Sequence, residues 1–456
     1  MAKYFGTNGI RGKYDFLNPD FSFKVAYATG IFFKKGKILV GMDGRLTSLE
    51  IKEAVLQGLE SAGCRTVDLG LVSTPTAEFM VKRLSADGLI VVTASHNPPE
   101  WNGLKIIDKN CIPLSKERGE EIEKLIDELL QKYNAQDGNA KDGNKNTKKN
   151  TGNREKYESA TMDHINAIKK HIKRKKINKK ILLDCANGAA SIIAPYLFRE
   201  LGCEVTSINS HVDGNFPGRL SEPTESNVSD LINIMKNGDY DCGIAWDGDG
   251  DRVILVDEKG NFVIGDKVFA LSIMLKFKEK IGNIVTTVAT SMAIQDIAKK
   301  SKAQVYLTKI GAPYIAEEFV KRNAIIGGEE VGGVMWPEIS LSKDGFMTAV
   351  KIVEALEEKP LSKWLNEIPV YYNEKIKIPA NDNEKIKIIK AMRDYAIKNK
   401  LNFIDIDGVR INFDDSWVIV RASGTENYIR IFTEAKTEKK AKMLLEEYEK
   451  LAKSFS

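Results

Sequence analysis

Residues 241–256 read Asp241-Cys-Gly-Ile-Ala-Trp-Asp-Gly-Asp-Gly-Asp-Arg-Val-Ile-Leu-Val256, so that two apolar runs flank three aspartates at alternate positions. The apolar runs predict two strands. The glycines between the aspartates allow a tight loop in which alternate side chains converge. Three carboxylates suit a hard cation such as Mg2+. We therefore predict a metal site formed by Asp247, Asp249 and Asp251 in a loop between two strands.

Two other interpretations of this loop are a calcium EF-hand and an acidic turn that holds no metal. The EF-hand offsets are occupied by Asp247, Asp249, Asp251, Ile254 and Glu258. However, Arg252 stands where the EF-hand needs its turn glycine, and the flanking runs predict strands instead of helices. The sequence therefore favours the magnesium site over both alternatives.

Upstream of this loop, apolar runs alternate with helix-like stretches. Expected strands at 37–41, 65–69 and 88–93 alternate with expected helices at 49–62 and 76–84. This order predicts a mostly parallel sheet with helices on its faces, and sites form in the loops after the carboxyl ends of such strands. The pattern restarts twice, and the tail then predicts hairpin strands with two helices.

The expected fold class is three tandem α/β domains with mixed sheets, followed by a C-terminal α+β domain. The expected domain boundaries are 1–133, 155–258, 259–366 and 367–456. Between the first two domains, residues 134–153 contain no aliphatic side chain larger than alanine, so they cannot contribute to a core. We expect residues 134–154 to be a disordered insert or linker.

The composition is that of an ordinary globular protein. The 456 residues include 68 Lys plus Arg and 63 Asp plus Glu, a formal net charge of +5. The apolar runs are far shorter than the ~20 residues of a membrane helix, and the N-terminus lacks the apolar stretch of a secretory signal. We expect a cytoplasmic protein with no membrane partner. The five cysteines are scattered, without a CxxC pair, and are expected to be reduced core thiols.

A second candidate site follows the expected strand at 88–93, in the loop Thr93-Ala-Ser-His-Asn-Pro-Pro-Glu-Trp-Asn-Gly-Leu-Lys105. Ser95 lies where a nucleophile would sit at the end of a buried strand. A serine that merely shapes the loop is the alternative, because the Gly-x-Ser-x-Gly elbow is absent. His96 is a candidate catalytic residue or a loop-stabilising hydrogen-bonding group. Lys105 is a candidate proton shuttle with a lowered pKa.

Three further loops are candidates for binding an anion or a substrate. In Arg421-Ala-Ser-Gly-Thr-Glu-Asn-Tyr-Ile-Arg430, hydroxyls, a glycine and guanidinium groups can form an anion cup, and an ordinary turn is the alternative. The cup residues are Arg421, Ser423, Gly424, Thr425 and Arg430. The glycine-rich stretches 327–333 and 5–12 present Glu329 and Arg11.

The basic cluster from Lys169 to Lys180 has two interpretations. Lysine- and arginine-rich segments attract nucleic-acid phosphates. However, this cluster lacks interleaved aromatic residues and falls at an expected helix-to-strand turn. A solvated connection is therefore favoured, and no nucleic-acid partner is expected.

In order along the chain, the serine, triple-aspartate, Gly-Glu and anion loops resemble those of the α-D-phosphohexomutase superfamily, which includes phosphoglucomutase, phosphomannomutase and phosphoglucosamine mutase. The motifs that carry the resemblance are Thr93-Ala-Ser-His-Asn-Pro-Pro99, Asp247-Gly-Asp-Gly-Asp-Arg252 and Arg421-Ala-Ser-Gly-Thr-Glu426. The resemblance covers the chain apart from the low-complexity segment. It implies four domains around a central cleft, the last one like the TATA-binding protein.

The resemblance also implies an activity, the interconversion of hexose 1-phosphate and 6-phosphate. Ser95 would be a phosphoserine that gives its phosphoryl group to one end of the sugar phosphate. The bisphosphosugar would reorient, and Ser95 would take a phosphoryl group back from the other end. The Ser95 phosphate and the three aspartates would hold Mg2+, and a sugar 1,6-bisphosphate would act as activator.

Other roles follow from the same resemblance. Lys105 matches the general acid/base, and Arg11 and Arg252 match residues that steady the transferring charge. Glu329 matches the sugar-hydroxyl ligand. The residues that bind the non-reacting phosphate in the family correspond to Arg421, Ser423 and Thr425. The expected partner is a phosphosugar, and the expected assembly is a monomer or homodimer.

The sugar loop departs from many bacterial members. Val331 replaces a serine and Gly333 a histidine, a form that resembles archaeal-type members. Lys309 resembles the phosphoglucosamine mutase version of its segment, although Ala312 replaces a polar residue of some relatives. The sequence thus leans towards glucosamine phosphate and leaves mannose and glucose phosphates open. A nucleic-acid-binding protein and a catalytically silent phosphosugar sensor are the alternatives to an enzyme.

Overall fold

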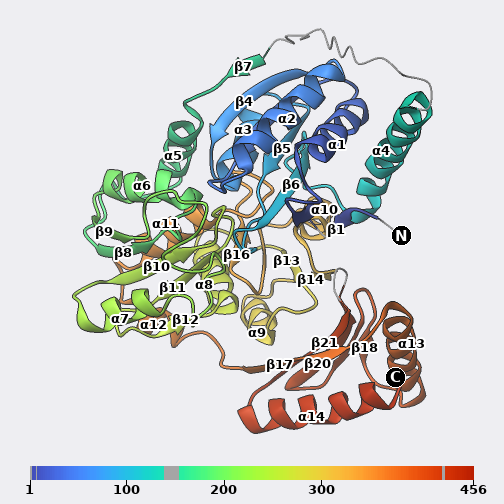
Figure 1. Ribbon diagram of the computed structural model, residues 1–456. Helices are drawn as coiled ribbons and strands as arrows, with labels where there is room; N and C mark the ends of the chain where they lie inside the picture. Colours follow the sequence, from blue (N-terminus) through green and yellow to red (C-terminus); the bar gives the residue numbers. More distant parts are fainter. Residues whose placement is uncertain (1–2, 7, 138–153, 424–426, 456) are drawn as a thin grey trace. The chain divides into compact units, whose positions relative to one another are not determined.

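The computed structural model describes residues 3–6, 8–137, 154–423 and 427–455, which form two compact units (Figure 1). Unit 1 comprises Met1–Val268 and Val331–Lys363, and unit 2 comprises Phe269–Glu330 and Trp364–Ser456. The chain passes between the units within helices α8 (Gly265–Phe277) and α12 (Leu361–Leu365) and directly after strand β15 (Ile326–Glu329).

Unit 1 begins with a seven-stranded mixed sheet in the order β1-β2-β6-β5-β3-β4-β7. Its elements are β1 (Phe5–Gly6), β2 (Gly9–Lys13), α1 (Pro19–Phe32), β3 (Lys37–Met42), α2 (Ser48–Ser61), β4 (Arg65–Leu71), α3 (Thr74–Arg83), β5 (Gly88–Val92), β6 (Trp101–Asp108), α4 (Lys116–Asp137) and β7 (Arg154–Lys156). The strands β3, β4, β5 and β7 are parallel, as the alternation predicts. The strands β6, β2 and β1 are antiparallel, because β6 returns directly after the serine loop with no helix between.

Helices cover both faces of this sheet. One core joins side chains of α1, α2 and α4 to one face, including Val25, Val55 and Ile122. A second core joins Ala77 and Met80 of α3 to the other face. This three-layer packing follows from strands that are apolar on both faces, since β5 is buried throughout.

The structure differs from the expected linker at both of its ends. Residues 134–137 continue α4, and Arg154 starts β7, which pairs in parallel with β4. The guanidinium of Arg154 donates to Glu60 at 2.8 Å and to Glu53 at 2.7 Å, both on α2. The linker prediction was therefore wrong for residues 134–137 and 154, because low local hydrophobicity does not reveal helix continuation or strand pairing. The remainder of the segment, 138–153, lies outside the described residues.

A second sheet of unit 1 has the order β12-β11-β10-β8-β9, with β10, β8 and β9 parallel and β11 and β12 antiparallel. The elements of this part are α5 (Ala160–Lys170), β8 (Lys180–Asp184), a 3-10 turn (Ala189–Ile192), α6 (Ala194–Glu200), β9 (Glu204–Ile208), α7 (Ser229–Asn237), β10 (Cys242–Trp246), β11 (Val253–Val256) and β12 (Phe262–Val263). Unit 1 also contains β16 (Gly333–Met335) and α11 (Gly345–Ala355), whose first turn is capped by Asp344.

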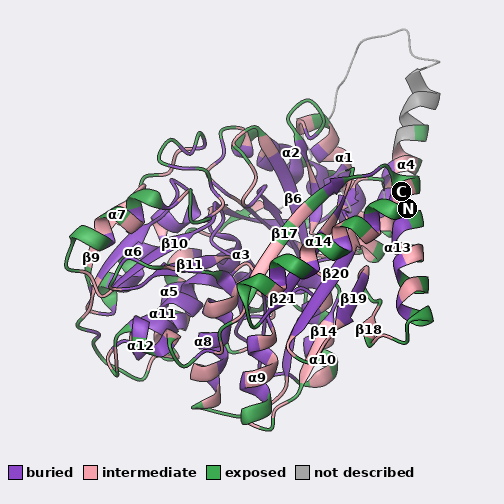
Figure 2. Cartoon of the chain, turned by 90° about the horizontal axis from the view of Figure 1, so that it is seen from below, coloured by how far each residue is buried: buried purple, intermediate pink, exposed green. Residues whose placement is uncertain are grey.

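Unit 2 contains a parallel core of three strands and a five-stranded antiparallel sheet in the order β17-β21-β20-β19-β18. Its other elements are β13 (Ile284–Thr287), α9 (Met292–Lys300), β14 (Val305–Thr308), α10 (Ala312–Arg322), β17 (Tyr372–Pro379), α13 (Asp382–Lys398), β18 (Phe403–Ile404), β19 (Val409–Asn412), β20 (Ser416–Ala422), β21 (Tyr428–Ala435) and α14 (Glu438–Ser454). Figure 2 shows the buried strand β20 and the exposed outer face of α14. These sheets confirm the predicted α/β class with an antiparallel C-terminal domain.

The cysteines and the helices of the described residues bear on two expectations, reduced thiols and the lack of a membrane span. All five cysteines are buried and unpaired, as expected for core thiols. In the part of the chain that the structure describes, no helix has the length and apolar character needed to cross a bilayer.

Candidate active site

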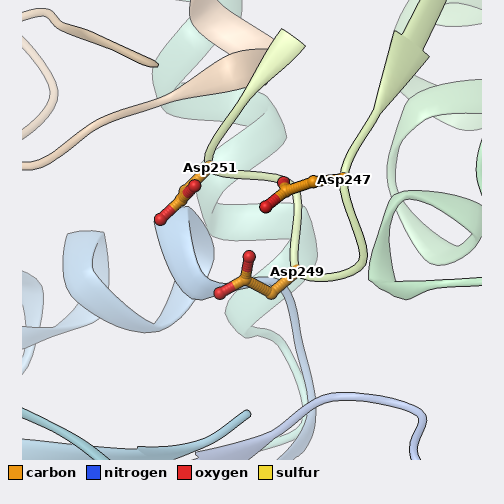
Figure 3. A group of neighbouring side chains, drawn as sticks. All are labelled: Asp247, Asp249 and Asp251. Atoms are coloured by element: carbon orange, nitrogen blue, oxygen red, sulfur yellow. The ribbon is translucent and has the colours of Figure 1, made fainter. Parts of the chain in front are cut away.

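The three aspartates of the predicted metal loop converge in unit 1 (Figure 3). Asp247, Asp249 and Asp251 are buried, and one ligand oxygen from each lies within 4.8 Å of the others. The flanking strands β10 and β11 pair antiparallel, with Trp246 opposite Val253, so the loop is a tight strand connection. This confirms the strand prediction and excludes an EF-hand, which requires flanking helices.

The two glycines of the loop are required by close contacts. A Cβ atom on Gly248 would lie 2.6 Å from the carbonyl oxygen of Ser95. Gly250 has a φ of +81°, which favours glycine, and a Cβ atom there would lie 2.7 Å from the ring of Phe346. The alternation of aspartate and glycine therefore brings the carboxylates together and lets the serine loop approach them.

The residues present fit a divalent cation. Among the residues that the structure describes, the Oδ1 atoms of Asp249 and Asp251 are buried without a hydrogen-bond partner. A buried, unpaired carboxylate oxygen is costly, and a hard cation would satisfy both atoms. Burial, followed by Asp249 and Asp251, raises the pKa of Asp247 well above its usual value. The loop can therefore hold a metal ion, and the charge of the ion would relieve the repulsion among the carboxylates.

Ser95 lies directly beside this trio. Its Oγ donates to Asp247 Oδ2 at 2.8 Å, although the two residues are 152 positions apart. The side chain is 1% exposed, and the backbone has a φ of +53°, an uncommon conformation for serine. A serine that only shaped its loop would not need to face three carboxylates. Ser95 therefore lies at the carboxylate cluster, a position that a nucleophile could use.

Lys105 reaches the same carboxylates from strand β6, where it lies opposite Val91 of β5. Its Nζ donates to Asp249 Oδ2 at 2.6 Å and to Asp251 Oδ2 at 2.9 Å. Burial lowers the pKa of Lys105, but the two carboxylates outweigh burial and raise it above its usual value. The prediction of a lowered pKa was therefore wrong for this arrangement, in which Lys105 carries a proton. Burial raises the pKa values of Asp249 and Asp251, but Lys105 lowers both, helped by Thr74 at Asp249 and by Lys343 and Arg252 at Asp251, and the net direction is downward.

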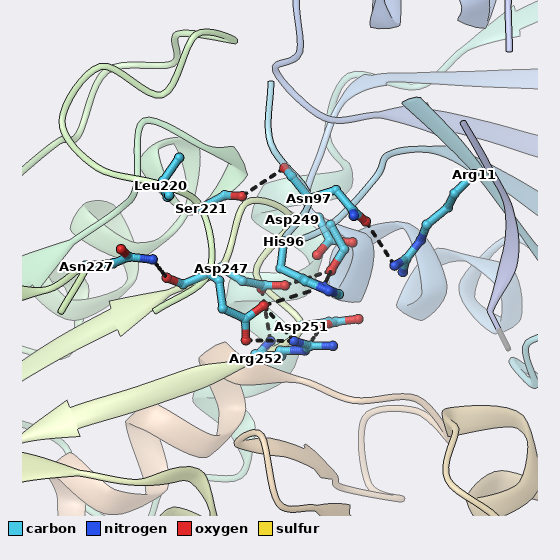
Figure 4. Close-up of polar contacts among 12 residues, drawn as sticks. Arg11, His96, Asn97, Leu220, Ser221, Asn227, Asp247, Asp249, Asp251 and Arg252 are labelled. Atoms are coloured by element: carbon cyan, nitrogen blue, oxygen red, sulfur yellow. Dashed lines mark hydrogen bonds and ion pairs between the residues drawn. The ribbon is translucent and has the colours of Figure 1, made fainter. Parts of the chain in front are cut away.

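The predicted arginines border the serine loop (Figure 4). Arg11 donates from Nη1 to Asn97 Oδ1 at 3.1 Å. Arg252 donates from Nη1 to both carboxylate oxygens of Glu222, at 2.8 and 2.9 Å. The structure thus brings two guanidinium groups to the loop of Ser95, where they can neutralise developing phosphate charge.

His96 follows the nucleophile and is the fourth predicted group at this loop. Its Nδ1 lies 3.4 Å from Ser95 Oγ and 3.6 Å from Glu222. Burial, followed by Arg252 and Arg11, lowers the pKa of His96 far below its usual value. The imidazole is therefore neutral, which suits a hydrogen-bonding group better than a proton donor.

Several side chains at the site carry no sequence motif that identifies them. Thr74, at the start of α3, donates from Oγ1 to Asp249 Oδ2 at 2.5 Å. Lys343 Nζ lies 3.4 Å from Asp251 Oδ2. Their signals are a Ser-Thr-Pro helix start after a parallel strand and a lysine before the Asp-Gly that starts α11. Neither signal distinguishes a site residue from an ordinary helix cap.

Glu78 is a further buried carboxyl of this region, on helix α3. Burial raises its pKa to about 8; Lys105 opposes this shift, and Asp251 and Asp249 add to it. The ordinary glutamate value of 4.5 applies to the unfolded chain. Between these two values the folded protein binds more protons than the unfolded chain. The contribution of Glu78 to stability is therefore complete below pH 4.5 and is lost as the pH rises towards 8.

Between pH 5 and pH 8, the ionisation of Glu78 lowers the free energy of unfolding of the wild type. We expect Glu78→Gln to lack this loss, so that the change of its unfolding free energy from pH 5 to pH 8 is more favourable than that of the wild type by on the order of 3 kcal/mol. Glutamine cannot ionise, so the variant does not carry the cost of a buried negative charge at pH 8. Denaturant unfolding of metal-free protein at both pH values measures this double difference, in which packing effects cancel. An equal difference between variant and wild type at pH 5 and pH 8 would contradict the prediction.

The predicted phosphate-binding residues lie in unit 2. Asp407 contacts both the end of the strand that carries Arg421 and the loop that carries Lys309. Its carboxylate pairs with Arg421 at 3.1 Å and accepts the backbone N–H of Ile310 at 2.9 Å. Lys309, next to Ile310, lies over the ring of Tyr314 at 5.1 Å from the centroid. The structure therefore brings the strand end at Arg421 to the loop that carries Lys309.

The remaining predicted residues of unit 2 are placed individually. Ser423 is 5% exposed and its N–H donates to the carbonyl of Tyr428 at 3.0 Å. Arg430 donates to the hydroxyl of Tyr428 at 2.8 Å. Glu329 is buried at the end of β15. Gly424 and Thr425 lie outside the described residues.

The basic cluster at 169–180 is a solvated connection with acidic partners. Residues 173–176 are exposed between α5 and β8. Lys169 pairs with Glu200 at 2.6 Å, and Lys180 pairs with Asp239 at 3.2 Å. Partial neutralisation of this kind does not support a nucleic-acid interface.

Comparison with known proteins identifies the family of the chain. Family models described as phosphoglucomutase/phosphomannomutase domains I, II and III and C-terminal domain match residues 2–132, 161–260, 264–372 and 375–451. The chain is 41% identical over 458 residues to "Phosphoglucomutase/phosphomannomutase" of Thermococcus kodakarensis, covering 98% of this chain and 97% of the relative. It is 37% identical over 470 residues to "Phosphoglucosamine mutase" of Methanocaldococcus jannaschii, covering 99% of each.

Solved structures show the same fold. A phosphoglucomutase/phosphomannomutase family protein from Burkholderia thailandensis superposes with a TM-score of 0.85 at 25% identity, over 100% of this chain and 98% of that one. An Aspergillus fumigatus N-acetylphosphoglucosamine mutase, solved with GlcNAc-6P and magnesium, superposes with a TM-score of 0.58 at 16% identity, over 97% and 94% of the chains. With four consecutive domain models matched and full-length relatives above 30% identity, the chain belongs to the phosphoglucomutase/phosphomannomutase family of phosphohexomutases.

Proposed function

We propose that this protein interconverts a hexose 1-phosphate and the 6-phosphate through a phosphoserine at Ser95 and a bisphosphosugar, with Mg2+ at Asp247, Asp249 and Asp251. One observation carries the proposal: Ser95 Oγ lies 2.8 Å from Asp247, at the carboxylate cluster that Lys105 also reaches. The domain boundaries at 1–133, 155–258, 259–366 and 367–456 are proposed with it.

The reaction balances as two phosphoryl transfers. In the first, the bond between phosphorus and Ser95 Oγ breaks as phosphorus bonds to a sugar hydroxyl oxygen, which loses its proton. In the second, the bond between phosphorus and the oxygen at the other end of the sugar breaks as phosphorus bonds to Ser95 Oγ, and that sugar oxygen gains a proton. Such transfers need positioning and charge neutralisation more than covalent chemistry from the protein. A bound Mg2+ would supply positive charge to the transferring group and offset the carboxylates that raise the pKa of Lys105.

Each predicted residue has a defined task in this scheme. Lys105 is hydrogen-bonded to Asp249 and Asp251, where it can give a proton to, or take one from, the exchanging oxygens. Arg11 and Arg252 neutralise charge on the phosphoryl group, and His96 supports the loop. In unit 2, Glu329 is proposed to bind sugar hydroxyls. The phosphate at the far end is proposed to bind Lys309, Arg421, Ser423, Gly424, Thr425 and Arg430.

The sugar is proposed to be glucosamine, mannose or glucose phosphate, with a lean to glucosamine. Lys309 and a relative named phosphoglucosamine mutase support the lean, whereas another relative carries the phosphoglucomutase/phosphomannomutase name. A sugar 1,6-bisphosphate is the proposed activator. The protein is proposed to be cytoplasmic and a monomer or homodimer.

The test is a comparison of kcat/KM for the 1-phosphates of the three sugars, with Mg2+ and a catalytic amount of each bisphosphate. A preference above about tenfold, worth roughly 1.4 kcal/mol, would name the substrate. Comparable rates on two or three sugars would show a general phosphohexomutase, as expected if Val331 and Gly333 remove discriminating contacts. No turnover of any of them would reject the proposal.

A further inference from the structure

The segment Asp43-Gly-Arg45 leaves strand β3 beside the serine loop. Strands β3 and β5 are parallel, with Met42 opposite Val92, and the N–H of Asp43 donates to the carbonyl of Val92 at 3.0 Å. The serine loop starts at the next residue after β5. Asp43 and Arg45 therefore lie at the same sheet edge as Ser95, although no sequence motif joins them to it.

Arg45 uses every N–H group of its guanidinium. Nη2 donates to the carbonyls of Ser95 at 2.9 Å and Asn97 at 2.7 Å. Nη1 donates to the carbonyls of Pro98 at 2.6 Å and Trp101 at 3.0 Å. Nε completes the set by donating to Asp43 Oδ2 at 3.1 Å. Five donors in a fixed planar fork are thus matched by five acceptors, in a side chain whose residue is 3% exposed.

These contacts extend along the loop from the residue of the candidate nucleophile to the strand of the candidate acid/base. The Ser95 carbonyl belongs to the nucleophile, and Trp101 is the first residue of β6, the strand that carries Lys105. The Arg45 guanidinium also lies over the ring of Phe216, 5.1 Å from its centroid, which closes its outer face. One side chain therefore sets the path of the backbone from Ser95 to the start of β6.

Asp43 holds the other backbone group of Ser95. The N–H of Ser95 donates to Thr93 Oγ1 at 2.9 Å, and that hydroxyl donates to Asp43 Oδ2 at 2.7 Å. Asp43 Oδ1 in turn accepts from Ser48 Oγ at 2.8 Å, which anchors the carboxylate to the start of α2. Both the N–H and the C=O of Ser95 are thus fixed by the Asp43–Arg45 pair. This is a physical reason why Ser95 keeps a φ of +53°.

We propose that the Asp43–Arg45 pair positions Ser95 Oγ for phosphoryl transfer, so that its loss lowers kcat and leaves substrate binding nearly unchanged. The inference rests on the proposed function, in which Ser95 carries the phosphoryl group. Arg45 donates to four loop carbonyls and to Asp43, so it acts through the position of the loop and is a positioning residue. A displacement of the order of 1 Å at a reacting atom can cost about 100-fold in rate.

The first experiment compares Arg45→Lys with Lys52→Arg. Lysine keeps the charge at position 45, but its three donors cannot replace a fork that serves five acceptors. Lys52 is the matched control because it forms a buried ion pair with Asp68 at 2.6 Å in the same sheet domain, with exposed side-chain fractions of 5% and 6%. We expect kcat of Arg45→Lys to fall about 100-fold, with KM within about threefold of wild type. We expect kcat of Lys52→Arg to change less than twofold, even if the substitution lowers the Tm of the protein.

Two readouts separate positioning from structural damage. Calorimetric titration of metal-free Arg45→Lys with Mg2+ should give the wild-type affinity, because the three aspartates are intact. Free guanidinium ion should restore part of the kcat of Arg45→Ala by filling the vacated position, and should not affect the wild type. A kcat of Arg45→Lys within twofold of wild type, or a loss no larger than that of Lys52→Arg, would overturn the proposal.

Substitution of Thr93 is a second, milder test, which can be used if Arg45→Lys does not fold. Thr93→Val keeps the side-chain shape but removes the hydroxyl that joins Ser95 to Asp43, whereas Thr93→Ser keeps it. We expect a kcat about tenfold lower for the valine variant than for the serine variant, at similar KM. Equal kcat values would overturn the proposal. Wild-type protein that turns over no sugar phosphate would reject the proposed function, whereas active wild type with equally active variants would reject only the positioning role.

Discussion

Ser95→Ala is expected to reduce mutase turnover by at least about 10,000-fold, equivalent to roughly 5 kcal/mol of transition-state stabilisation. Alanine has no oxygen to accept or return the phosphoryl group, so both half-reactions stop. The substitution removes one hydroxyl from a buried position, with its hydrogen bond to Asp247 and its longer contact with His96 Nδ1. The fold should therefore survive, and substrate binding should persist without turnover.

The measurement is the rate of 1-phosphate to 6-phosphate conversion, together with the intact mass after incubation with a sugar bisphosphate. Wild type should gain the mass of one phosphoryl group, and Ser95→Ala should not. Ser22→Ala is the matched control, because Ser22 is a buried serine of helix α1 whose Oγ has no hydrogen-bond partner in the described part of the chain. It should keep wild-type activity and phosphorylation. Turnover by Ser95→Ala near the control rate would end the phosphoserine assignment.

Asp249→Asn is expected to weaken Mg2+ binding and turnover by at least about 100-fold each. The substitution removes one of three converging carboxylates and leaves a neutral amide beside Lys105. It also replaces an acceptor of two strong contacts, from Thr74 Oγ1 and from Lys105 Nζ. Both the charge that attracts the cation and the position of the acid/base group therefore change.

Calorimetric titration with Mg2+ measures the affinity, and kcat is measured at saturating Mg2+ to separate the two losses. Asp257→Asn is the matched control: Asp257 is 3% exposed, directly follows β11 and accepts backbone N–H groups of its own turn. It should lose stability and keep its affinity for Mg2+. If Asp249→Asn bound Mg2+ as tightly as wild type, the three aspartates would not be the metal site.

Much of the fold follows from local patterns in the sequence. The predicted helix at 49–62 and the observed α2 (Ser48–Ser61) differ by one residue at each end. The predicted strands at 37–41 and 88–93 are observed as β3 and β5. Periodicity of apolar residues is a property of consecutive positions, so it can be detected without knowledge of partners. Strand β6 was missed, because residues 93–105 were treated as one loop.

The electrostatic state of the site could not be predicted in this way. Lys105 was expected to have a lowered pKa because burial destabilises an ammonium group. Its raised pKa comes from Asp249 and Asp251, which are 144 and 146 positions away in the chain. Such a sign depends on which charges the fold brings within a few ångströms.

The sequence by itself determined the alternation of strands and helices, the metal-loop chemistry at 247–251 and the identity of Ser95 as a candidate nucleophile, because each is encoded by residue types at short spacing. Only the tertiary structure decided that Ser95 meets Asp247, that Lys105 is held protonated, and that Arg45 fastens the serine loop. The partners of Arg45 in that loop are backbone carbonyls, which every residue possesses. No residue pattern can single them out until folding places five acceptors around one guanidinium group.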